Sequence, residues 1–114
     1  MYIGEVASQT GLSIKAIRLY EEMGLIAPAR QGRYRYYQGA DLEVLKLIVQ
    51  ARQLGIKLAE LKGAIHYRQG RLDWARVEQL LLQVRNRLEQ EQASIQSRLN
   101  NLDLCMQSLQ SCDQ

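Results

Sequence analysis

The sequence contains one proline, two cysteines and one histidine in 114 residues, and it has no run of about 18 consecutive apolar residues. We therefore expect no membrane-spanning helix and no membrane partner. The first residues have neither a basic start nor an apolar stretch, so no secretory signal peptide is visible. Two cysteines near one end do not make a disulfide framework, which favours a reduced, cytoplasmic setting.

Residues that carry catalysis are also scarce. No Ser/His/acid set, no pair of catalytic carboxylates and no glycine-rich phosphate loop can be recognised. A chain of this length has room for one domain, or for a small domain with one long element, and little room for a large enzyme fold. We therefore expect a protein that is not an enzyme.

The charge is unevenly distributed along the chain. Residues 1–71 contain 11 Lys and Arg against 6 Asp and Glu, a net charge of +5, whereas residues 72–114 contain 4 against 6, a net charge of −2. A basic first part before a mildly acidic, Leu- and Gln-rich second part suggests a polyanion-binding module with an appendage. We expect two domains with these boundaries, 1–71 and 72–114.

The first two dozen residues have the pattern of two short helices joined by a tight turn. Apolar residues at helical spacing predict a helix over 2–9, and Gly11 suits a turn with positive φ. Ser13 can cap a second helix over 14–23, because its hydroxyl can accept a free amide of the next turn. Gly24 is typical of a helix C-terminus. Two such helices are the signature of a helix-turn-helix.

The densest basic and aromatic cluster follows over residues 30–37. The pair at 31–32 suits a hairpin turn, and residues 33–36 alternate Arg and Tyr with the period of a strand. Alternate residues point to opposite faces, so Arg33 and Arg35 should share one face and the two tyrosines the other. One face can then bind phosphate while the other packs inward.

Three further helices are predicted. Asp41 can cap a helix over about 42–54, and apolar residues from 58 onward define a short helix that ends near residues 69–70. Asp73 can cap a last helix that begins at Trp74. No Gly or Pro occurs after residue 70, so about 38 residues of helix would form a rod of roughly 55–60 Å.

This last helix carries a heptad seam with two charged interruptions. Its positions, spaced alternately by four and three residues, are Val77, Leu81, Val84, Leu88, Glu91, Ile95, Arg98, Leu102, Cys105, Leu109 and Cys112. A rod of this length cannot bury its seam against a module of about 70 residues, so we expect it to pair with a second copy.

The two charged seam positions favour antiparallel pairing. If Glu91 faces the partner's Arg98, Val84 lies opposite the partner's Cys105 and Val77 opposite the partner's Cys112, with Ile95 near the two-fold axis. A parallel pair would instead place like charges against each other at both positions. The ion pairs would then help to fix the register.

Taken together, these segments resemble the MerR family of bacterial transcription regulators. The matching stretches are Ile3-Gly4-Glu5-Val6-Ala7, Gly11-Leu12-Ser13, residues 15–25 with Ala16-Ile17-Arg18-Leu19-Tyr20-Glu21-Glu22-Met23-Gly24-Leu25, Gly32-Arg33-Tyr34-Arg35-Tyr36-Tyr37 and Ala51-Arg52-Gln53-Leu54-Gly55. The pattern covers essentially the whole chain.

The resemblance implies a mainly α fold, a winged helix-turn-helix with a short β-hairpin wing and a long C-terminal antiparallel coiled-coil dimerisation helix. It also implies a cytoplasmic, nucleoid-associated bacterial homodimer. Such a dimer binds a pseudo-palindrome in double-stranded promoter DNA and distorts a spacer that is too long for RNA polymerase. By this resemblance, binding of an effector realigns the promoter and controls transcription.

The residues expected at the DNA are Lys15, Arg18, Tyr20, Arg33, Tyr34, Arg35, Arg30 and Arg52. The second helix should enter the major groove with Lys15 near base edges and phosphates and Arg18 on a phosphate. Tyr20 is mostly core-facing, with a hydroxyl within reach of the DNA backbone. The family pattern favours Tyr34 and Arg35 as phosphate or minor-groove contacts. Arg30 and Arg52 are second-tier candidates.

The family places its effector site between the start of one long helix and the end of the partner's. Tyr67, Trp74, Cys105 and Cys112 would bound such a pocket, although we expect Trp74 to pack mainly into the core. The cysteines are candidates for structural seam residues, for sensing a thiol-reactive effector or for binding a metal ion. On a continuous helix they lie about 10.5 Å apart, too far to share one metal or a disulfide.

One departure from metal-sensing relatives counts against a divalent metal. Those relatives carry a cysteine at the start of the long helix, where this chain has Leu72-Asp73. Two other functions compete with an effector-controlled regulator. One is an architectural, excisionase-like DNA-bending protein that answers to no effector, and the other is a coiled-coil adaptor whose basic half binds an acidic protein.

Overall fold

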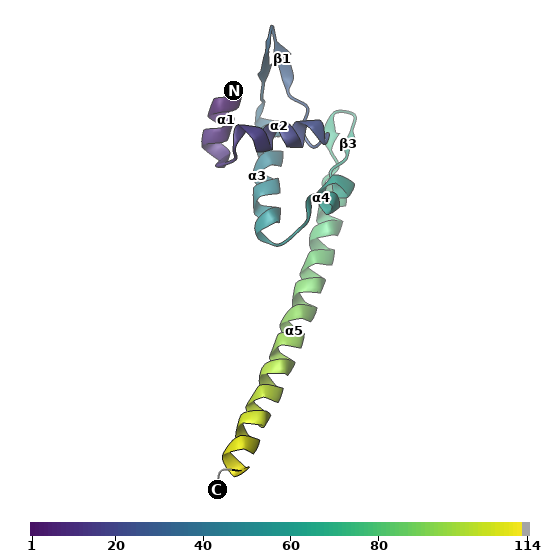
Figure 1. Cartoon of the computed structure of the whole chain (residues 1–114). Coiled ribbons are helices and arrows are strands. Elements are labelled where there is room, and N and C mark those ends of the chain that lie inside the picture. The colour runs from purple at the N-terminus through teal and green to yellow at the C-terminus, as the bar shows by residue number, and fades with distance from the viewer. Residues whose placement is uncertain (113–114) are drawn as a thin grey trace. The chain divides into compact units, whose positions relative to one another are not determined.

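The computed structural model describes residues 1–112. The elements, labelled in Figure 1, are α1 (Ile3–Thr10), α2 (Ile14–Glu22), β1 (Ala29–Gln31), β2 (Tyr34–Tyr36), α3 (Gly39–Gln53), α4 (Leu58–Ala64), β3 (Tyr67–Arg68), β4 (Arg71–Leu72) and α5 (Trp74–Cys112). They form two compact units, an N-terminal unit from Met1 to Val77 and a second unit from Glu78 onward. The predicted mainly α fold with a short hairpin and a long C-terminal helix is confirmed.

The turn between α1 and α2 is built as its sequence predicts. Gly11 follows α1 with φ +75°, a left-handed conformation that a residue without Cβ adopts cheaply, and its N–H donates to the Ala7 carbonyl. The Ser13 hydroxyl accepts a hydrogen bond from the Ala16 N–H over 3.0 Å, which starts α2. The entry into α2 is therefore fixed by local chemistry on both sides of the turn.

The core of the N-terminal unit lies among its helices. In this unit α1 packs against both α2 and α3. The largest side chains that are fully buried are Tyr37, Ile17, Leu25, Ile26, Leu45, Ile48, Ile56, Leu61 and Val6. These side chains come from α1, α2, α3, α4 and the segments that follow α2, β2 and α3, so burying their apolar surfaces joins these elements into one body.

The third helix starts three residues earlier than its sequence suggests. Asp41 does not stand before α3 but in its first turn, where its carboxylate accepts a hydrogen bond from the Gln38 N–H over 3.0 Å. The same contact recurs at α4, where the Glu60 carboxylate accepts a hydrogen bond from the Lys57 N–H over 2.9 Å. An acidic residue at the third helical position therefore marks both starts.

The short fourth helix ends at Ala64, so its predicted extension to residues 69–70 is wrong. Residues 67–72 form a second hairpin instead, in which Tyr67 pairs with Leu72 and Arg68 with Arg71. The two turn residues, Gln69 and Gly70, have φ of +53° and +76°. Positive φ at both central residues defines a type I′ turn, whose twist matches that of a two-stranded ribbon.

The last helix begins at Trp74, as predicted, and α5 runs for 39 residues. At 1.5 Å per residue this is about 58 Å. Its surface beyond Val84 is exposed in the single chain throughout the described part. Among the described residues, no helix combines the length and apolar character needed to cross a membrane.

Candidate nucleic-acid interface

The exposed face of α2 carries the first group of predicted DNA contacts. Ile17 and Tyr20 are buried and turn one side of this helix into the core. Lys15 and Arg18 are exposed on the other side. Tyr20 is only 7% exposed, so the structure assigns it to packing and leaves the basic pair on the open surface.

The first hairpin, β1–β2, differs from its prediction by the position of its turn. The strands pair with Ala29 opposite Tyr36, Arg30 opposite Arg35 and Gln31 opposite Tyr34. The turn is therefore made by residues 32 and 33, and Gly32 has φ +62°, as the first central residue of a type II′ turn requires. The prediction that Arg33 lies in the strand beside Arg35 is wrong, because it stands at the tip of the hairpin.

The tyrosines of this hairpin share one face, as the alternation predicts. The ring of Tyr2 packs edge-to-face against Tyr34 and Tyr36, with centroid distances of 6.1 and 5.6 Å. Met1 and Tyr37 exchange backbone hydrogen bonds of 2.9 and 2.6 Å. The N-terminal segment thus braces the base of the hairpin from one side.

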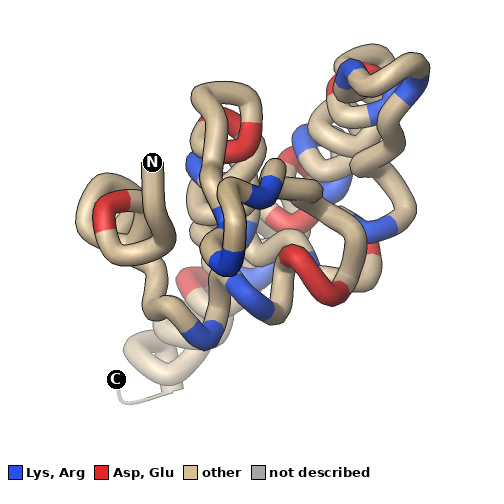
Figure 2. The backbone as a smooth tube through the Cα atoms, turned by 90° about the horizontal axis from the view of Figure 1, so that it is seen from above, with Lys and Arg blue, Asp and Glu red and all other residues tan. Residues whose placement is uncertain are grey.

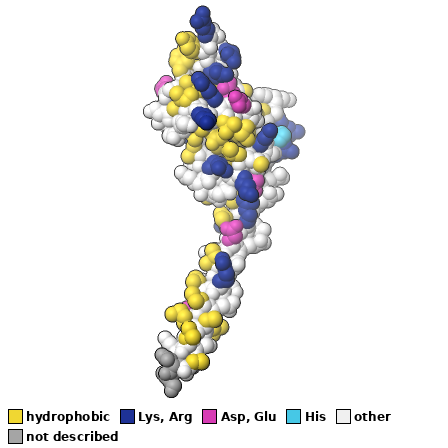
Figure 3. Space-filling view, in the orientation of Figure 1, with side chains coloured by type: hydrophobic (Ala, Val, Ile, Leu, Met, Phe, Trp, Pro, Cys, Tyr) yellow, Lys and Arg dark blue, Asp and Glu magenta, His cyan; other side chains and the backbone are white. Residues whose placement is uncertain are grey.

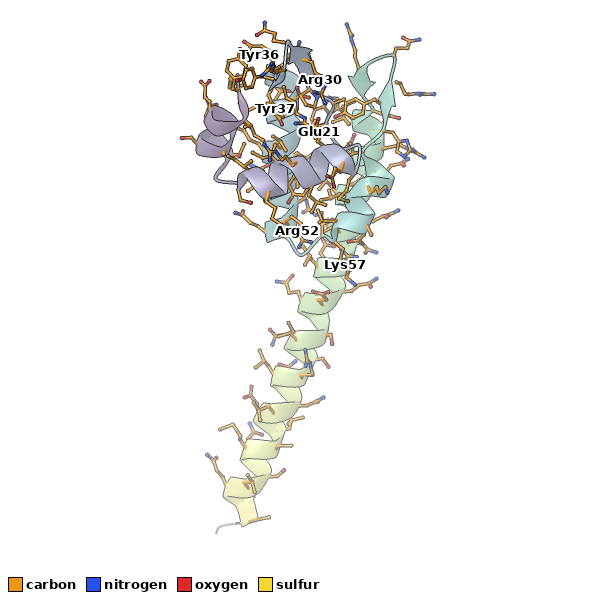
Figure 4. All side chains as sticks on the ribbon, turned by 45° about the horizontal axis from the view of Figure 1, so that its top comes forward. Glu21, Arg30, Tyr36, Tyr37, Arg52 and Lys57 are labelled. Carbon is orange, nitrogen blue, oxygen red and sulfur yellow. The ribbon has the colours of Figure 1, made fainter. Side chains whose placement is uncertain are left out.

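An ion pair braces the hairpin from another side. The Arg35 Nε donates to the Glu21 carboxylate over 2.7 Å, with 36% and 22% of the two side chains exposed. Figure 4 shows Glu21, Arg30 and Tyr37 where α2 meets the base of this hairpin. Arg30 lies directly opposite Arg35, an arrangement of like charges that costs stability, and Glu21 offsets it.

These elements enclose a hollow that gathers half of the predicted DNA contacts. Its lining consists of Tyr2, Ile3, Arg18, Arg33, Tyr34 and Arg35. Three arginines from α2, the turn and β2 therefore line one concave surface, together with two tyrosines. Convergent guanidinium groups with hydroxyl neighbours suit the oxygens of a phosphate.

The remaining predicted contacts lie apart from this hollow. Lys15 borders a shallow surface along the outer face of α2, and Arg30 is exposed on the hairpin. Arg52 donates from Nη1 to the Ile56 carbonyl over 3.0 Å, so it holds the turn between α3 and α4. The structure gives Arg52 a structural contact that its sequence does not reveal.

Two basic residues of the second hairpin were missed by the sequence analysis. Arg68 and Arg71 are exposed and directly opposite each other on β3 and β4. Tyr67 anchors this hairpin, because its hydroxyl donates to the Leu25 carbonyl, just beyond α2, over 2.6 Å. Burial raises the pKa of Tyr67, and Asp41 adds to the rise. Gly70, which permits the tight turn, is the one sequence signal that could have indicated a hairpin here.

Figure 2 marks the charged positions along the backbone, and Figure 3 shows Lys and Arg spread over the visible face of the N-terminal unit. Seven of the eleven Lys and Arg of residues 1–71 lie on α2 and the two hairpins, and of these all but Arg35 are exposed. Exposed basic side chains gathered in this way are expected on a surface that binds a polyanion.

The predicted effector residues are only partly brought together. Tyr67 and Trp74 line one groove beside the start of α3, but Trp74 is 52% exposed, so its predicted role in the core is wrong. Cys105 and Cys112 are both exposed free thiols on α5. Among the described residues, no group of three His, Cys, Asp or Glu side chains could hold a metal ion.

The predicted seam of α5 divides into two parts. Val77 and Val84 are already buried in the single chain, at 4% and 3% exposed. From Leu88 onward the seam residues are exposed to solvent, and Figure 3 shows hydrophobic side chains along this helix. Leu99 and Met106, which the sequence analysis did not select, are exposed at 48% and 53%, one position after Arg98 and Cys105.

The chain matches known families along most of its length. Residues 1–68 match the model of the MerR HTH family regulatory protein, and residues 42–105 match the model named MerR, DNA binding. The HTH-type transcriptional regulator CueR of Salmonella typhi is 48% identical over 62 residues, which are 53% of this chain and 45% of that relative. The heavy metal-dependent transcription regulator 2 of Rhizobium meliloti is 41% identical over 64 residues, 54% and 44% of the two chains.

A solved structure agrees over almost the whole chain. It is a putative MerR family transcriptional regulator from Listeria monocytogenes, with a TM-score of 0.60, 28% identity and coverage of 93% of this chain and 83% of that one. This chain spans a little under half the length of the curated relatives it matches. With a family model over more than half of its residues, the chain belongs to the MerR family of helix-turn-helix transcription regulators, not to an enzyme family.

Proposed function

We propose that this chain is a dimeric regulator that binds a pseudo-palindromic site in double-stranded promoter DNA and distorts it to control transcription by RNA polymerase. The observation that carries the proposal is the joint surface of α2 and the first hairpin. Lys15 and Arg18 are exposed on the helix, and Arg33 stands exposed at the hairpin tip. A helix with basic residues at its N-terminal end and a basic hairpin beside it fits a major groove and the adjoining phosphates.

The hollow between α2 and the hairpin supplies the positioning contacts. Arg18, Arg33 and Arg35 border it, and such contacts fix the register of a protein on DNA without reading its sequence. Arg68 and Arg71 extend the basic surface to the second hairpin, which rises from the same end of the N-terminal unit as the first (Figure 1). Several phosphate contacts per protomer make binding strongly dependent on salt.

Dimerisation would come from α5. Its exposed apolar side chains beyond Leu88 leave a long surface uncovered in the single chain. Coverage by a second, antiparallel copy would remove that surface from water and would place two α2 helices on two half-sites. The proposed contacts are Val77, Leu81, Val84, Leu88, Glu91, Ile95, Arg98, Leu102 and Leu109, with Glu91 paired to the partner's Arg98. Val77 and Val84 are already buried in the single chain, so the newly covered surface comes from the other positions.

The effector is part of the same proposal. Likeness to a heavy metal-dependent regulator supports a metal ion as effector. The exposed thiols of Cys105 and Cys112 are the groups that would bind it or react with a thiol-reactive compound. In-vitro transcription with and without metals, diamide and aldehydes tests this, repeated on Cys105→Ser and Cys112→Ser. If both variants respond like the parent, thiol chemistry is not the trigger. A regulator that bends DNA and responds to nothing would be the architectural alternative.

The DNA-binding part of the proposal is tested with a double-stranded DNA fragment that the protein selects from a random library. Fluorescence anisotropy at several salt concentrations should show a steep fall in affinity with salt. Lys15→Ala and Arg18→Ala should weaken binding and each lower the slope by about 1 if the residue holds a phosphate. Lys46→Ala, which removes an exposed charge from α3, is the matched control. Binding without salt dependence, or equal losses in the control, would contradict the proposal.

A further inference from the structure

The outer face of α2 is not purely basic. Between its charged side chains it exposes two apolar ones, Ile14 at 41% and Leu19 at 43%. Both border the same shallow surface as Lys15, Arg18 and Glu22. Their side chains face the position that the proposed function gives to DNA, so their most direct partner there is an apolar group on the DNA.

Ile14 is the one of the two that can reach base edges. It is the first residue of α2, directly after the Ser13 cap whose hydrogen bond to Ala16 holds the first turn. In helices that enter the major groove, the N-terminal residues contact the bases. A β-branched side chain also has few rotamers, so Ile14 loses little freedom when it is covered. Leu19 lies more than one turn further along and borders Glu22.

The major groove offers one apolar group, the C5-methyl of thymine. We propose that Ile14 recognises a thymine methyl group in each half-site and is a specificity-determining residue of this chain. Lys15 beside it supplies the charge that holds the helix against the DNA, and Ile14 supplies discrimination. This inference rests on the proposed function, because it needs α2 in the major groove.

Replacing thymine by uracil in the selected fragment removes the methyl group and nothing else. At one thymine per half-site, uracil should weaken binding by the wild type about 4-fold, which corresponds to about 0.8 kcal/mol for one buried methyl group. Ile14→Ala should weaken binding to the thymine fragment and show no further loss with uracil at that position. Ile14→Val, which keeps the branch at Cβ, should retain part of the discrimination.

Leu19→Ala is the matched control, since it truncates an equally exposed apolar side chain on the same helix. It should keep the full loss on uracil substitution. If the wild type and Ile14→Ala lose equally at every thymine, or lose nothing, the inference is overturned while the proposed function stands. If the wild type selects no DNA from the library, the proposed function fails and this inference fails with it.

Discussion

The guanidinium Nε of Arg35 on β2 donates to the Glu21 carboxylate on α2 over 2.7 Å. This contact connects the hairpin to the helix that is proposed to enter the major groove. Because Arg35 also borders the hollow beside Arg18 and Arg33, one side chain has two roles. It sets the position of the hairpin through Nε, and its side chain, 36% exposed, also lines the hollow.

Arg35→Ala should therefore change both stability and DNA binding. Loss of the partly exposed ion pair should lower the free energy of unfolding by about 0.5–1 kcal/mol, measured by urea denaturation. Affinity should fall for all DNA sequences, and the salt slope should decrease by about 1. A double-mutant cycle with Glu21→Gln isolates the pair. Arg33→Ala, at the exposed tip, should affect the slope without affecting stability. An unchanged slope in Arg35→Ala would remove that residue from the DNA contacts.

Substitution of Tyr37 should have a different effect from substitution of Arg35. Its side chain is fully buried, and its hydroxyl has no hydrogen-bond partner among the described residues. Tyr37→Phe removes this uncompensated group, so the unfolding free energy near neutral pH should be unchanged or rise by about 1 kcal/mol. Tyr67→Phe is the control. It deletes the hydrogen bond to the Leu25 carbonyl and should destabilise by about 1 kcal/mol. A large loss in Tyr37→Phe would show that the hydroxyl has a partner.

The same tyrosine gives a pH dependence. Burial raises the pKa of Tyr37 above its ordinary value of 10.0, and the Glu21 carboxylate adds to the rise. The folded state thus holds the phenolic proton more tightly than the unfolded state. This contribution to stability is complete below about pH 10 and is lost as the pH rises through the folded-state pKa. Urea denaturation between about pH 8 and about pH 11 should show a steeper alkaline loss in the wild type than in Tyr37→Phe. Equal slopes would contradict this origin.

Much of the fold could be predicted from the sequence because its signals are local. The cap at Ser13, the glycine at the end of α1 and the start of α5 at Trp74 each depend on a few neighbouring residues, and all three were correctly placed. The second hairpin was missed because its strands contain two residues each, too few to show a period of two. Its turn also places Gln, rather than Asn or Asp, at the first position of positive φ.

The candidate site was less predictable because its geometry depends on tertiary contacts. Nothing in the sequence shows that Glu21 holds Arg35, or that Arg52 caps the turn at Ile56, since these pairings form only when the helices pack. The large apolar side chain of Trp74 likewise predicts burial, but the side chain is 52% exposed. Leu99 and Met106 were also missed. A strict heptad, with 3.5 residues per turn, selects positions 98 and 105, whereas an α-helix has 3.6 residues per turn and so brings the next positions, 99 and 106, towards the same face.

The left-handed Gln69 offers a simple test of the second hairpin. A residue with a Cβ at φ +53° is strained, and Asn-Gly is the preferred pair for a type I′ turn. Gln69→Asn should therefore raise the unfolding free energy by about 0.5–1 kcal/mol, measured by urea denaturation. Gly70→Ala, at φ +76°, should lower it. No difference between the two variants would mean that this hairpin opens before the core unfolds.

Reversing one seam charge distinguishes the possible dimers of α5. In the proposed antiparallel register, Glu91→Arg places an arginine against the partner's Arg98 twice per dimer, so dimerisation should weaken by about tenfold or more, measured by sedimentation equilibrium. Adding Arg98→Glu restores both ion pairs and should recover the dimer. A parallel seam behaves differently, since each reversal there exchanges one like-charge contact for another and the double variant recovers nothing.

The exposed stripe through Ile95, Leu99, Leu102, Met106 and Leu109 gives a third outcome. If the dimer is built on this stripe, positions 91 and 98 lie at its edge, where solvent screens charge. Single reversals would then change the dissociation constant little, and Leu99→Ala would weaken the dimer more than Glu91→Arg does. Gln96→Ala, outside both stripes, serves as the control for a general loss of helix stability. Only a loss in each single reversal with recovery in the double variant agrees with Glu91 facing the partner's Arg98.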